Sequence, residues 1–221
     1  MDLPGLGEVK GQWDLRGRFN DYIGHVPLAG KTFLDVGAAS GFLSFEAERR
    51  GAIVTSFDVD GQSRHQYLPN TSGPRIDAQR FRRRRNAYDL AHRLLGAKAH
   101  VVLGDVYDLS ARVEPHDIIL VGQVLAHLRD PLAALHQVAA VTRETLIIVE
   151  GSFESEQPLA VFVGSGRIYY SWWHLSSGLY RHWLQILGFD VVSMSRSTFT
   201  CCHVDMPGDA ELWTFVARRH Q

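Results

Sequence analysis

The sequence predicts an α/β domain in which helices cover both faces of a mostly parallel sheet. From Lys31 onward, short apolar runs alternate with segments whose apolar residues recur at helical spacing. A turn that contains glycines follows the first apolar run, and an acidic residue ends each of the second and third runs. The length of 221 residues fits a single domain that spans the whole chain, 1–221.

Composition excludes several other classes of protein. Hydrophobic residues make up 45% of the chain and charged residues 21%, which is typical of a globular protein and not of a disordered or fibrous one. The net charge of −1 provides no overall positive field for nucleic acid or membranes. The adjacent Cys201 and Cys202 cannot form a disulfide framework, and with His203 they complete no zinc site. Because the N-terminus lacks an apolar signal region, we expect a cytoplasmic protein with no membrane segment and no metal.

Seven strands and four helices follow from these patterns. The strands are expected at residues 32–36, 53–57, 100–103, 117–121, 145–149, 191–195 and 212–217. The helices are expected at residues 42–50, 78–95, 131–141 and 177–187. Pro207 and Gly208, between the last two strands, predict a hairpin-like return of the chain.

Two long segments interrupt the alternation, at residues 60–80 and 151–176. Both are longer than the usual loop of an α/β unit, so we expect them to build the substrate side of a site together with residues 1–30. The second segment contains an aromatic run that either covers a substrate or only packs the segment against the sheet. The residues of this run are Tyr169, Tyr170, Trp172, Trp173 and the adjacent His174.

The turn after the first strand has the form of a ligand-binding loop. Gly37 and Gly41 lack a Cβ, so backbone N–H groups can approach a bound molecule at the start of the following helix. The two competing ligands are a dinucleotide, whose fingerprint is G-x-G-x-x-G, and S-adenosylmethionine (SAM), whose fold has an acid two residues before the first glycine. Asp35 occupies that position and the dinucleotide spacing is absent, which favours SAM. The alternative is a tight turn that binds nothing.

Acids at the ends of the next two strands complete a nucleoside pocket. Asp58 lies about twenty residues after the first glycine, where a carboxylate can accept hydrogen bonds from both ribose hydroxyls. Asp105 follows the third strand, where it can accept a hydrogen bond from the adenine amine beside the Val106 N–H. Because ligands of open α/β sheets bind at the carboxyl ends of the strands, we expect these groups to line one crevice.

These motifs resemble those of the class I SAM-dependent methyltransferases. The matching segments are LDVGAASG, TSFDVD, GDVYDLS and HDIILVGQVLAHLRDP. The resemblance implies a Rossmann-like fold with a seven-stranded sheet of order 3-2-1-4-5-7-6, its last strand antiparallel. It also implies a set of cofactor contacts: Asp35 and the Gly37 backbone at the methionyl amino group, Asp58 at the ribose, Asp105 and Val106 at the adenine, and Gly122 and Gln123 at the methionyl side. Further cofactor contacts are expected from Ala38, Ser40, Gly41 and Val59.

Within that family the sequence is similar to the tRNA wobble-uridine carboxymethyltransferases and their relatives of unassigned substrate. The similarity lies in Trp13 with Arg16 or Arg18, in LAGKTFLDVG and in QVLAHLRDPLAAL. Trp13, Arg16 and Tyr22 precede the first strand and could fold over the cofactor as an N-terminal clasp, although Trp13 could instead only anchor the N-terminus. Ala126 stands where those enzymes have a tyrosine, and their N-terminal RNA-binding extension has no counterpart here, so we expect plain SAM and a smaller acceptor.

Three residues are candidates for a general base, which helps methyl transfer when the acceptor has a proton to lose. His127, after the fourth strand, is the first candidate, and its alternative role is to bond the backbone of the next turn. Glu150, after the fifth strand, is the second candidate, and its alternative role is to anchor a loop. His174 is the third.

A run of arginines, at positions 80 and 82–85, heads the helix expected at 78–95. It either contacts a phosphate or forms a solvated helix face. Overall, the sequence predicts a SAM-dependent methyltransferase that acts on a small-molecule acceptor, and RNA is the less favoured acceptor. The alternatives are a tRNA uridine-modifying methyltransferase, a SAM-using enzyme that releases methylthioadenosine, and a SAM-binding regulator without catalysis. The oligomeric state stays open.

Overall fold

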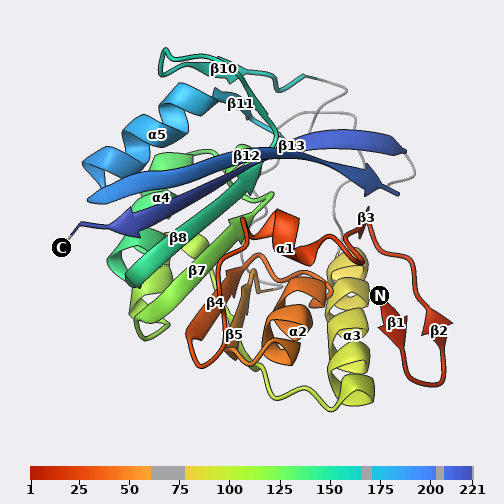
Figure 1. Cartoon of the computed structure of the whole chain (residues 1–221). Helices are drawn as coiled ribbons and strands as arrows, with labels where there is room; N and C mark the ends of the chain where they lie inside the picture. The colour runs from red at the N-terminus through yellow and green to blue at the C-terminus, as the bar shows by residue number, and fades with distance from the viewer. Residues whose placement is uncertain (61–77, 166–170, 203–206, 221) are drawn as a thin grey trace.

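The computed structural model describes residues 1–60, 78–165, 171–202 and 207–220. At its centre is an eight-stranded sheet of order β3-β12-β13-β8-β7-β4-β5-β6 (Figure 1). Five of its strands run parallel to one another: β4 (Thr32–Val36), β5 (Ile53–Asp58), β6 (His100–Leu103), β7 (His116–Gly122) and β8 (Thr142–Glu150). Three more complete the sheet on the β8 side: β13 (Gly208–Arg219), β12 (Phe189–Cys201) and the short β3 (Trp13–Asp14).

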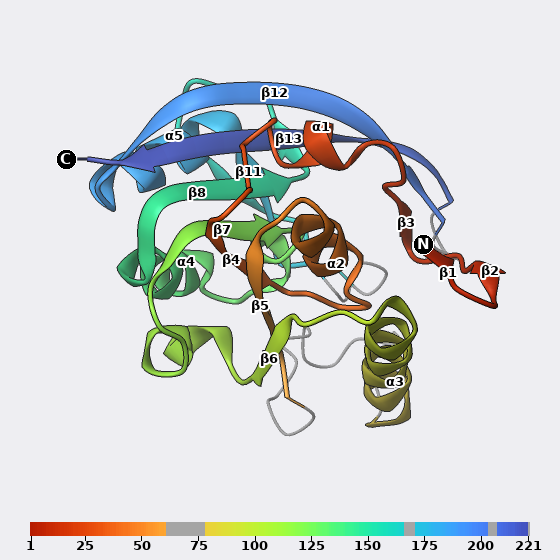
Figure 2. The ribbon, with the colours of Figure 1, turned by 60° about the horizontal axis from the view of Figure 1, so that its bottom comes forward.

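The seven expected strands lie in the expected order, and β13 is antiparallel to β8 and β12 as the resemblance implies. The expected count was wrong by one, because β3 adds an edge strand by pairing with the end of β12. The expected bounds of the last two strands were also wrong. The observed strands are much longer than residues 191–195 and 212–217, because β12 and β13 stay paired far beyond the apolar runs and many of their added residues are exposed. Figure 2 shows this hairpin arching over the other strands toward β3.

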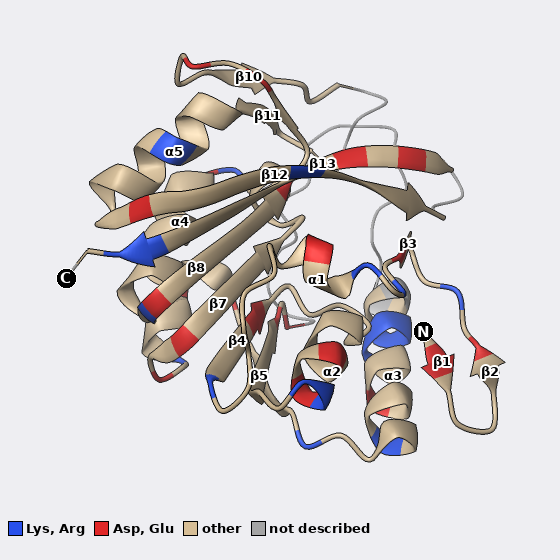
Figure 3. Ribbon diagram, in the orientation of Figure 1, with Lys and Arg blue, Asp and Glu red and all other residues tan. Residues whose placement is uncertain are grey.

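The four expected helices are present. On one face of the sheet lie α4 (Pro131–Ala140) and α5 (Ser177–Ile186), and on the other lie α1 (Phe19–Tyr22), α2 (Phe42–Arg49) and α3 (Ala78–Leu95) (Figure 1). Side-chain caps start two of them: Asp130 accepts a hydrogen bond from the Ala133 N–H at 3.0 Å, and Ser176 accepts one from the Leu179 N–H at 3.1 Å. Basic residues gather on α3 (Figure 3).

The core occupies both faces of the parallel strands. On β7, Ile118 and Leu120 pack into the cluster beneath α1 and α2, whereas Ile119 and Val121 pack into the cluster beneath α4 and α5. All four side chains are at most 2% exposed. Burial on both faces explains why these strands appear in the sequence as continuous apolar runs, and it makes the sheet a rigid support for the groups at its carboxyl ends.

The segment at 151–176 is not the simple loop that the sequence suggested. It contains β9 (Ser152–Phe153), β10 (Ala160–Phe162) and β11 (Trp173–Ser176), which form a small sheet of order β10-β11-β9 that leads into α5. At the N-terminus, β1 (Asp2–Leu3) and β2 (Gly7–Glu8) form a hairpin beside α3. Tyr169, Tyr170 and residues 61–77 lie outside the described residues. No described helix is both long and apolar enough to cross a membrane.

Candidate functional site

A cavity of about 990 Å³ opens at the carboxyl ends of the parallel strands. Its volume is at the upper end of the range for small-molecule sites, roughly 300–1,000 Å³. The structure therefore offers space for a nucleoside cofactor beside a second small molecule. The residues that sequence reasoning proposed and that line this cavity are Trp13, Arg16, Gly37, Ala38, Ser40, Asp58, Val59, Asp105, Val106, Gly122, Gln123 and His127.

The turn between β4 and α2 forms the floor of the cavity and leaves no room for larger side chains. Gly37 has a φ of +86°, and a Cβ there would lie 2.5 Å from Cγ2 of Val124. The N–H groups of Gly37 and Ala38 both donate to the carbonyl of Phe57, at 2.8 and 3.1 Å, which ties the turn to β5. Gly41 does not line the cavity but caps α2 with a left-handed φ of 87°. The turn is thus held in the shape of a cradle for a ligand.

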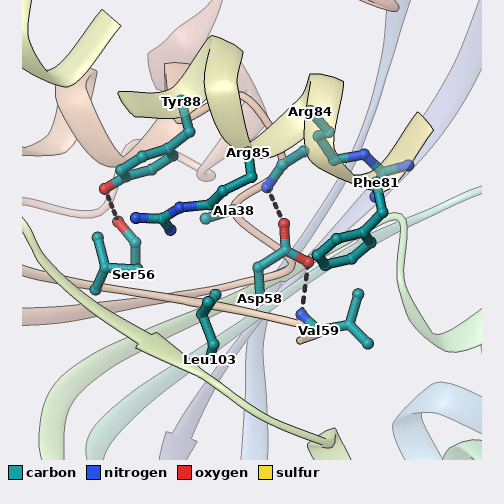
Figure 4. Close-up of a pocket in the computed structure, with 11 residues that line it drawn as sticks. Ala38, Ser56, Asp58, Val59, Phe81, Arg84, Arg85, Tyr88 and Leu103 are labelled. Atoms are coloured by element: carbon teal, nitrogen blue, oxygen red, sulfur yellow. Dashed lines mark hydrogen bonds between the residues drawn. The ribbon is translucent and has the colours of Figure 1, made fainter. Parts of the chain in front are cut away.

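Asp58 lies at the end of β5 with its carboxylate fixed in place. Its Oδ2 accepts a hydrogen bond from the Ala39 N–H at 3.0 Å, and its Oδ1 accepts one from the Val59 N–H at 2.8 Å (Figure 4). A second, smaller pocket beside the cavity is lined by this carboxylate and by Phe81 and Arg84 of α3 (Figure 4). A carboxylate oriented by two backbone donors is a preorganised acceptor for hydroxyl groups.

Asp105 lies at the next strand end and starts the short helix η1 (Val106–Ala111). Its Oδ1 accepts a hydrogen bond from the Tyr107 N–H at 3.1 Å, which fixes the side chain as an N-cap. Asp105 and Val106 both line the cavity, so the acids after β5 and β6 share one wall as the sequence predicts.

Asp35 lies beneath the turn and is not among the residues that line the cavity. It is 1% exposed, and its Oδ2 accepts a hydrogen bond from the Ser44 hydroxyl at 2.6 Å. Ser44 is bonded in turn to Ser56, and Ser56 to the Tyr88 hydroxyl, at 2.7 Å each. Within the described part of the chain, Oδ1 of Asp35 has no partner. Burial raises the pKa of this carboxyl to about 6.

Glu150, at the end of β8, is also buried and does not line the cavity. Its Oε1 accepts hydrogen bonds from the N–H groups of Val124 and Leu125, each at 2.7 Å. Gln123, which has a left-handed φ of 56°, approaches Oε2 at 3.4 Å through its side-chain amide. Burial raises the pKa of Glu150 to about 7, although the backbone donors oppose this shift. The carboxyl group therefore anchors the segment that leads to His127.

His127 ends the short helix η2 (Leu125–His127) and presents an exposed side chain to the cavity. By contrast, Trp172, Trp173 and His174 do not line the cavity. The Trp172 N–H donates to the carbonyl of Ala126 at 2.9 Å, and the Trp173 indole donates to the carbonyl of Arg129 at 3.2 Å. The described part of the aromatic run thus supports the loop that carries His127.

The N-terminal segment covers one side of the cavity, with Trp13 and Arg16 in its lining. The Arg16 guanidinium forms ion pairs with Asp14 at 2.7 Å, Glu8 at 3.0 Å and Asp2 at 3.5 Å. The hydrogen bond from Arg16 holds the pKa of Asp14 at about 2. The charge of Arg16 is therefore used to tie the β1–β2 hairpin to β3.

Sequence reasoning missed the far wall of the cavity, which the end of the β12–β13 hairpin supplies through residues 207–212. Residues 9–12, which lie within the segment 1–30 expected on the substrate side, also line the cavity. Both reach the site through pairing between β12 and β3, which lie far apart in the chain, and only the Pro207-Gly208 turn signal hinted at the hairpin. In the described residues, no cluster of His, Cys, Asp and Glu could hold a metal ion.

Comparison with known proteins identifies the family. Residues 34–148, just over half of the chain, match the methyltransferase domain family. No curated protein matches the chain in sequence.

Solved structures share its fold. Magnesium protoporphyrin IX methyltransferase from Synechocystis PCC 6803, with bound S-adenosylhomocysteine (SAH), has a TM-score of 0.60 and 15% identity, covering 93% of this chain and 82% of that one. The 1,6-didemethyltoxoflavin-N1-methyltransferase from Burkholderia thailandensis has a TM-score of 0.60 and 17% identity, covering 94% of this chain and 78% of that one. A structure described as a putative RNA methyltransferase from Pyrococcus horikoshii has a TM-score of 0.58 and 16% identity, covering 93% of this chain and 85% of that one. The chain therefore belongs to the methyltransferase domain family and is a methyl-transferring enzyme with SAM as its cofactor.

Proposed function

We propose that this enzyme methylates a small-molecule acceptor inside the cavity of about 990 Å³. The observation that carries the proposal is that the turn after β4, the ends of β5, β6 and β7, and His127 all line this one cavity. Two proteins of similar fold are named for small acceptors, Mg-protoporphyrin IX and 1,6-didemethyltoxoflavin. Their names support a small molecule as the class of acceptor.

The residues present fit SAM. A Cβ at Gly122 would lie 2.6 Å from the Tyr22 hydroxyl, so only glycine leaves the end of β7 open, as Gly37 does at the end of β4. Asp58 would hold the ribose hydroxyls, and Asp105 would hold the adenine amine. The methionyl group would lie over Gly37 and Gly122, where backbone groups without side chains in the way can contact it.

The chemistry requires little beyond positioning. Bound SAM supplies an electrophilic methyl group: a lone pair of the acceptor forms the new bond to the methyl carbon while the carbon–sulfur bond breaks and sulfur keeps its electron pair. His127 faces the cavity and would accept the proton that an alcohol or amine acceptor loses. The N-terminal segment and the hairpin end both line the cavity and would limit the access of water to a ligand bound between them.

A fractionation experiment tests the function. The enzyme is incubated with SAM and either a small-metabolite fraction or total tRNA, and the sulfur-containing product is identified by mass spectrometry. We expect SAH to form only with the small-metabolite fraction. Methylthioadenosine would indicate attack on another SAM carbon, turnover with tRNA would indicate an RNA-modifying enzyme, and binding without turnover would indicate a regulator.

Replacing His127 with alanine tests whether this residue is the general base. We expect turnover to fall by about 10²–10⁴-fold, because a general base typically contributes that much, while the affinity for SAM measured by calorimetry stays within twofold. His136→Ala, on the exposed side of α4, is the matched control and is expected to behave like the wild type. Equal turnover of the His127 variant and the wild type would remove His127 from this role.

An anionic acceptor such as RNA is the second candidate, and the arginines of α3 favour it. Arg82 and Arg83 are exposed, and Arg84 lines the cavity. For a small acceptor, we expect the double variant Arg82→Glu/Arg83→Glu to turn over within twofold of the wild type at every salt concentration. A loss of tenfold or more that grows as salt is lowered would instead show phosphate contact, because such contacts depend on ionic strength. Arg143→Glu, at the start of β8, is the control.

A further inference from the structure

Tyr22 lies at the end of α1 with its ring firmly held and its side chain facing the cavity. It is 3% exposed and is among the residues that line the cavity. Its ring packs edge-on against Phe199 of β12, with centroids 5.3 Å apart. Its carbonyl accepts a hydrogen bond from the Thr214 hydroxyl of β13 at 3.2 Å. The long antiparallel pair therefore fixes the position of this tyrosine.

The Tyr22 hydroxyl lies over the carboxyl end of β7. A Cβ at Gly122 would be only 2.6 Å from the phenol oxygen and 3.2 Å from the adjacent ring carbon. Among the described residues, no group forms a hydrogen bond with this hydroxyl. The hydroxyl is not among the fully buried polar atoms without a partner, so it is open to the cavity, and a molecule bound there can accept a hydrogen bond from it or donate one to it.

The electrostatic surroundings of this hydroxyl favour a cation. Burial, with the nearby carboxyls of Glu150 and Asp35, raises the pKa of Tyr22 far above its usual value, so the phenol stays neutral. The positively charged side chains of Lys10, Arg16 and Arg84 also line the cavity. Of these, Arg16 is neutralised by the carboxylates of Asp14, Glu8 and Asp2. At pH 8, above the pKa values of about 7 for Glu150 and about 6 for Asp35, both carboxyls are charged, and in a partly buried site their negative potential stabilises a positive charge more than it would in water.

We propose that the Tyr22 hydroxyl contacts the sulfonium end of bound SAM and makes the site prefer SAM to the neutral product SAH. This inference rests on the proposed binding of SAM in the cavity. The phenol oxygen presents a lone pair to the positively charged group, and SAH offers neither that charge nor the methyl group. Tyr22 would thus help to release the product after each turnover.

The chain provides a matched control in Tyr180, on α5. Tyr180 is fully buried, its hydroxyl has no partner within the described part of the chain, and the carboxyl of Glu150 acts on it as well. It differs in that it does not line the cavity. Tyr180→Phe therefore removes the same atom from a similar environment without touching a ligand.

The experiment measures dissociation constants for SAM and SAH by calorimetry at pH 8, for the wild type, Tyr22→Phe and Tyr180→Phe. We expect Tyr22→Phe to weaken SAM binding by about three- to tenfold, the usual effect of losing one polar contact, and to leave SAH binding within twofold. Tyr180→Phe is expected to change neither constant. Thermal unfolding of each variant shows whether the fold is kept.

Three results would overturn the inference. Unchanged SAM binding in Tyr22→Phe would show that the hydroxyl does not contact the cofactor, and an equal loss for SAM and SAH would show that the side chain only shapes the cavity. Equal effects of Tyr22→Phe and Tyr180→Phe would assign the change to the loss of any buried phenol. If the wild type itself bound no SAM, the proposed function would fail as well, so the two failures are distinguishable.

Discussion

Asp58→Ala is expected to bind SAM at least tenfold more weakly than the wild type. The Asp58 carboxylate is held by the N–H groups of Ala39 and Val59 and lines the cavity, so it is oriented before the ribose arrives. A hydrogen bond to a charged group contributes about 1.5–3 kcal/mol, and about 1.4 kcal/mol corresponds to a factor of ten in affinity. Calorimetric titration with SAM measures the effect directly.

The control for this variant is Asp190→Ala. Asp190 is an exposed acid near the start of β12 that pairs with His220 at 3.1 Å, and it does not line the cavity. We expect it to bind SAM as the wild type does. If Asp58→Ala kept both its thermal stability and full affinity for SAM, the assignment of the ribose site to the end of β5 would be refuted.

The second large effect is expected at Glu150, where alanine should remove most activity and destabilise the fold by about 3 kcal/mol. The N–H groups of Val124 and Leu125 would lose their acceptor in a buried place, and each unsatisfied group costs about 1–3 kcal/mol. The loop that presents His127 would then lose its anchor. Urea denaturation gives the stability, and the methyl-transfer assay gives the activity.

Glu150→Gln separates an anchor from a general base. Glutamine keeps a carbonyl oxygen for the same two backbone donors but cannot accept a proton at neutral pH. If Glu150 positions the loop, we expect this variant to retain activity within about fivefold of the wild type. A glutamine variant that folds and binds SAM normally but is as inactive as the alanine variant would identify Glu150 as the base.

The pH dependence of stability provides an independent check of the same residue. The pKa of Glu150 rises from 4.5 to about 7 in the folded protein, so the folded state keeps a proton that the unfolded chain releases. This carboxyl therefore makes the free energy of unfolding fall as pH rises from about 4.5 to 7, because one pKa unit corresponds to about 1.4 kcal/mol. Between pH 5 and 8, the free energy of unfolding of Glu150→Gln is expected to rise by about 2–3 kcal/mol relative to that of the wild type. A constant difference would contradict the burial of an ionisable carboxyl there.

The parallel core and the part of the cavity wall that contains Asp58 and Asp105 could be predicted from the sequence because they depend on local signals. Strands buried on both faces, such as β7, are continuous apolar runs, and the turn at Gly37 has a short pattern of its own. Once the strand order is given, Asp58 and Asp105 must end at the same edge of the sheet. Their place in one cavity therefore follows from spacing along the chain.

Other parts of the site depend on contacts between distant segments and could not be predicted. Nothing local distinguishes Asp58, which lines the cavity, from Asp35 and Glu150, which are covered by neighbouring elements. The same is true of Trp172, whose backbone pairs with the loop before His127. Tyr22 could be suspected as part of a clasp, but its exposure to the cavity is set by Phe199, on a strand whose full length the apolar pattern does not show.

A crystal structure of the enzyme with SAM tests the central claim most directly. The account predicts electron density for SAM in the cavity at the carboxyl ends of β4 to β7, with both ribose hydroxyls within hydrogen-bond distance of Asp58 and the adenine beside Asp105 and Val106. Density for SAM at any other place, or none under conditions where calorimetry shows saturation, would contradict it.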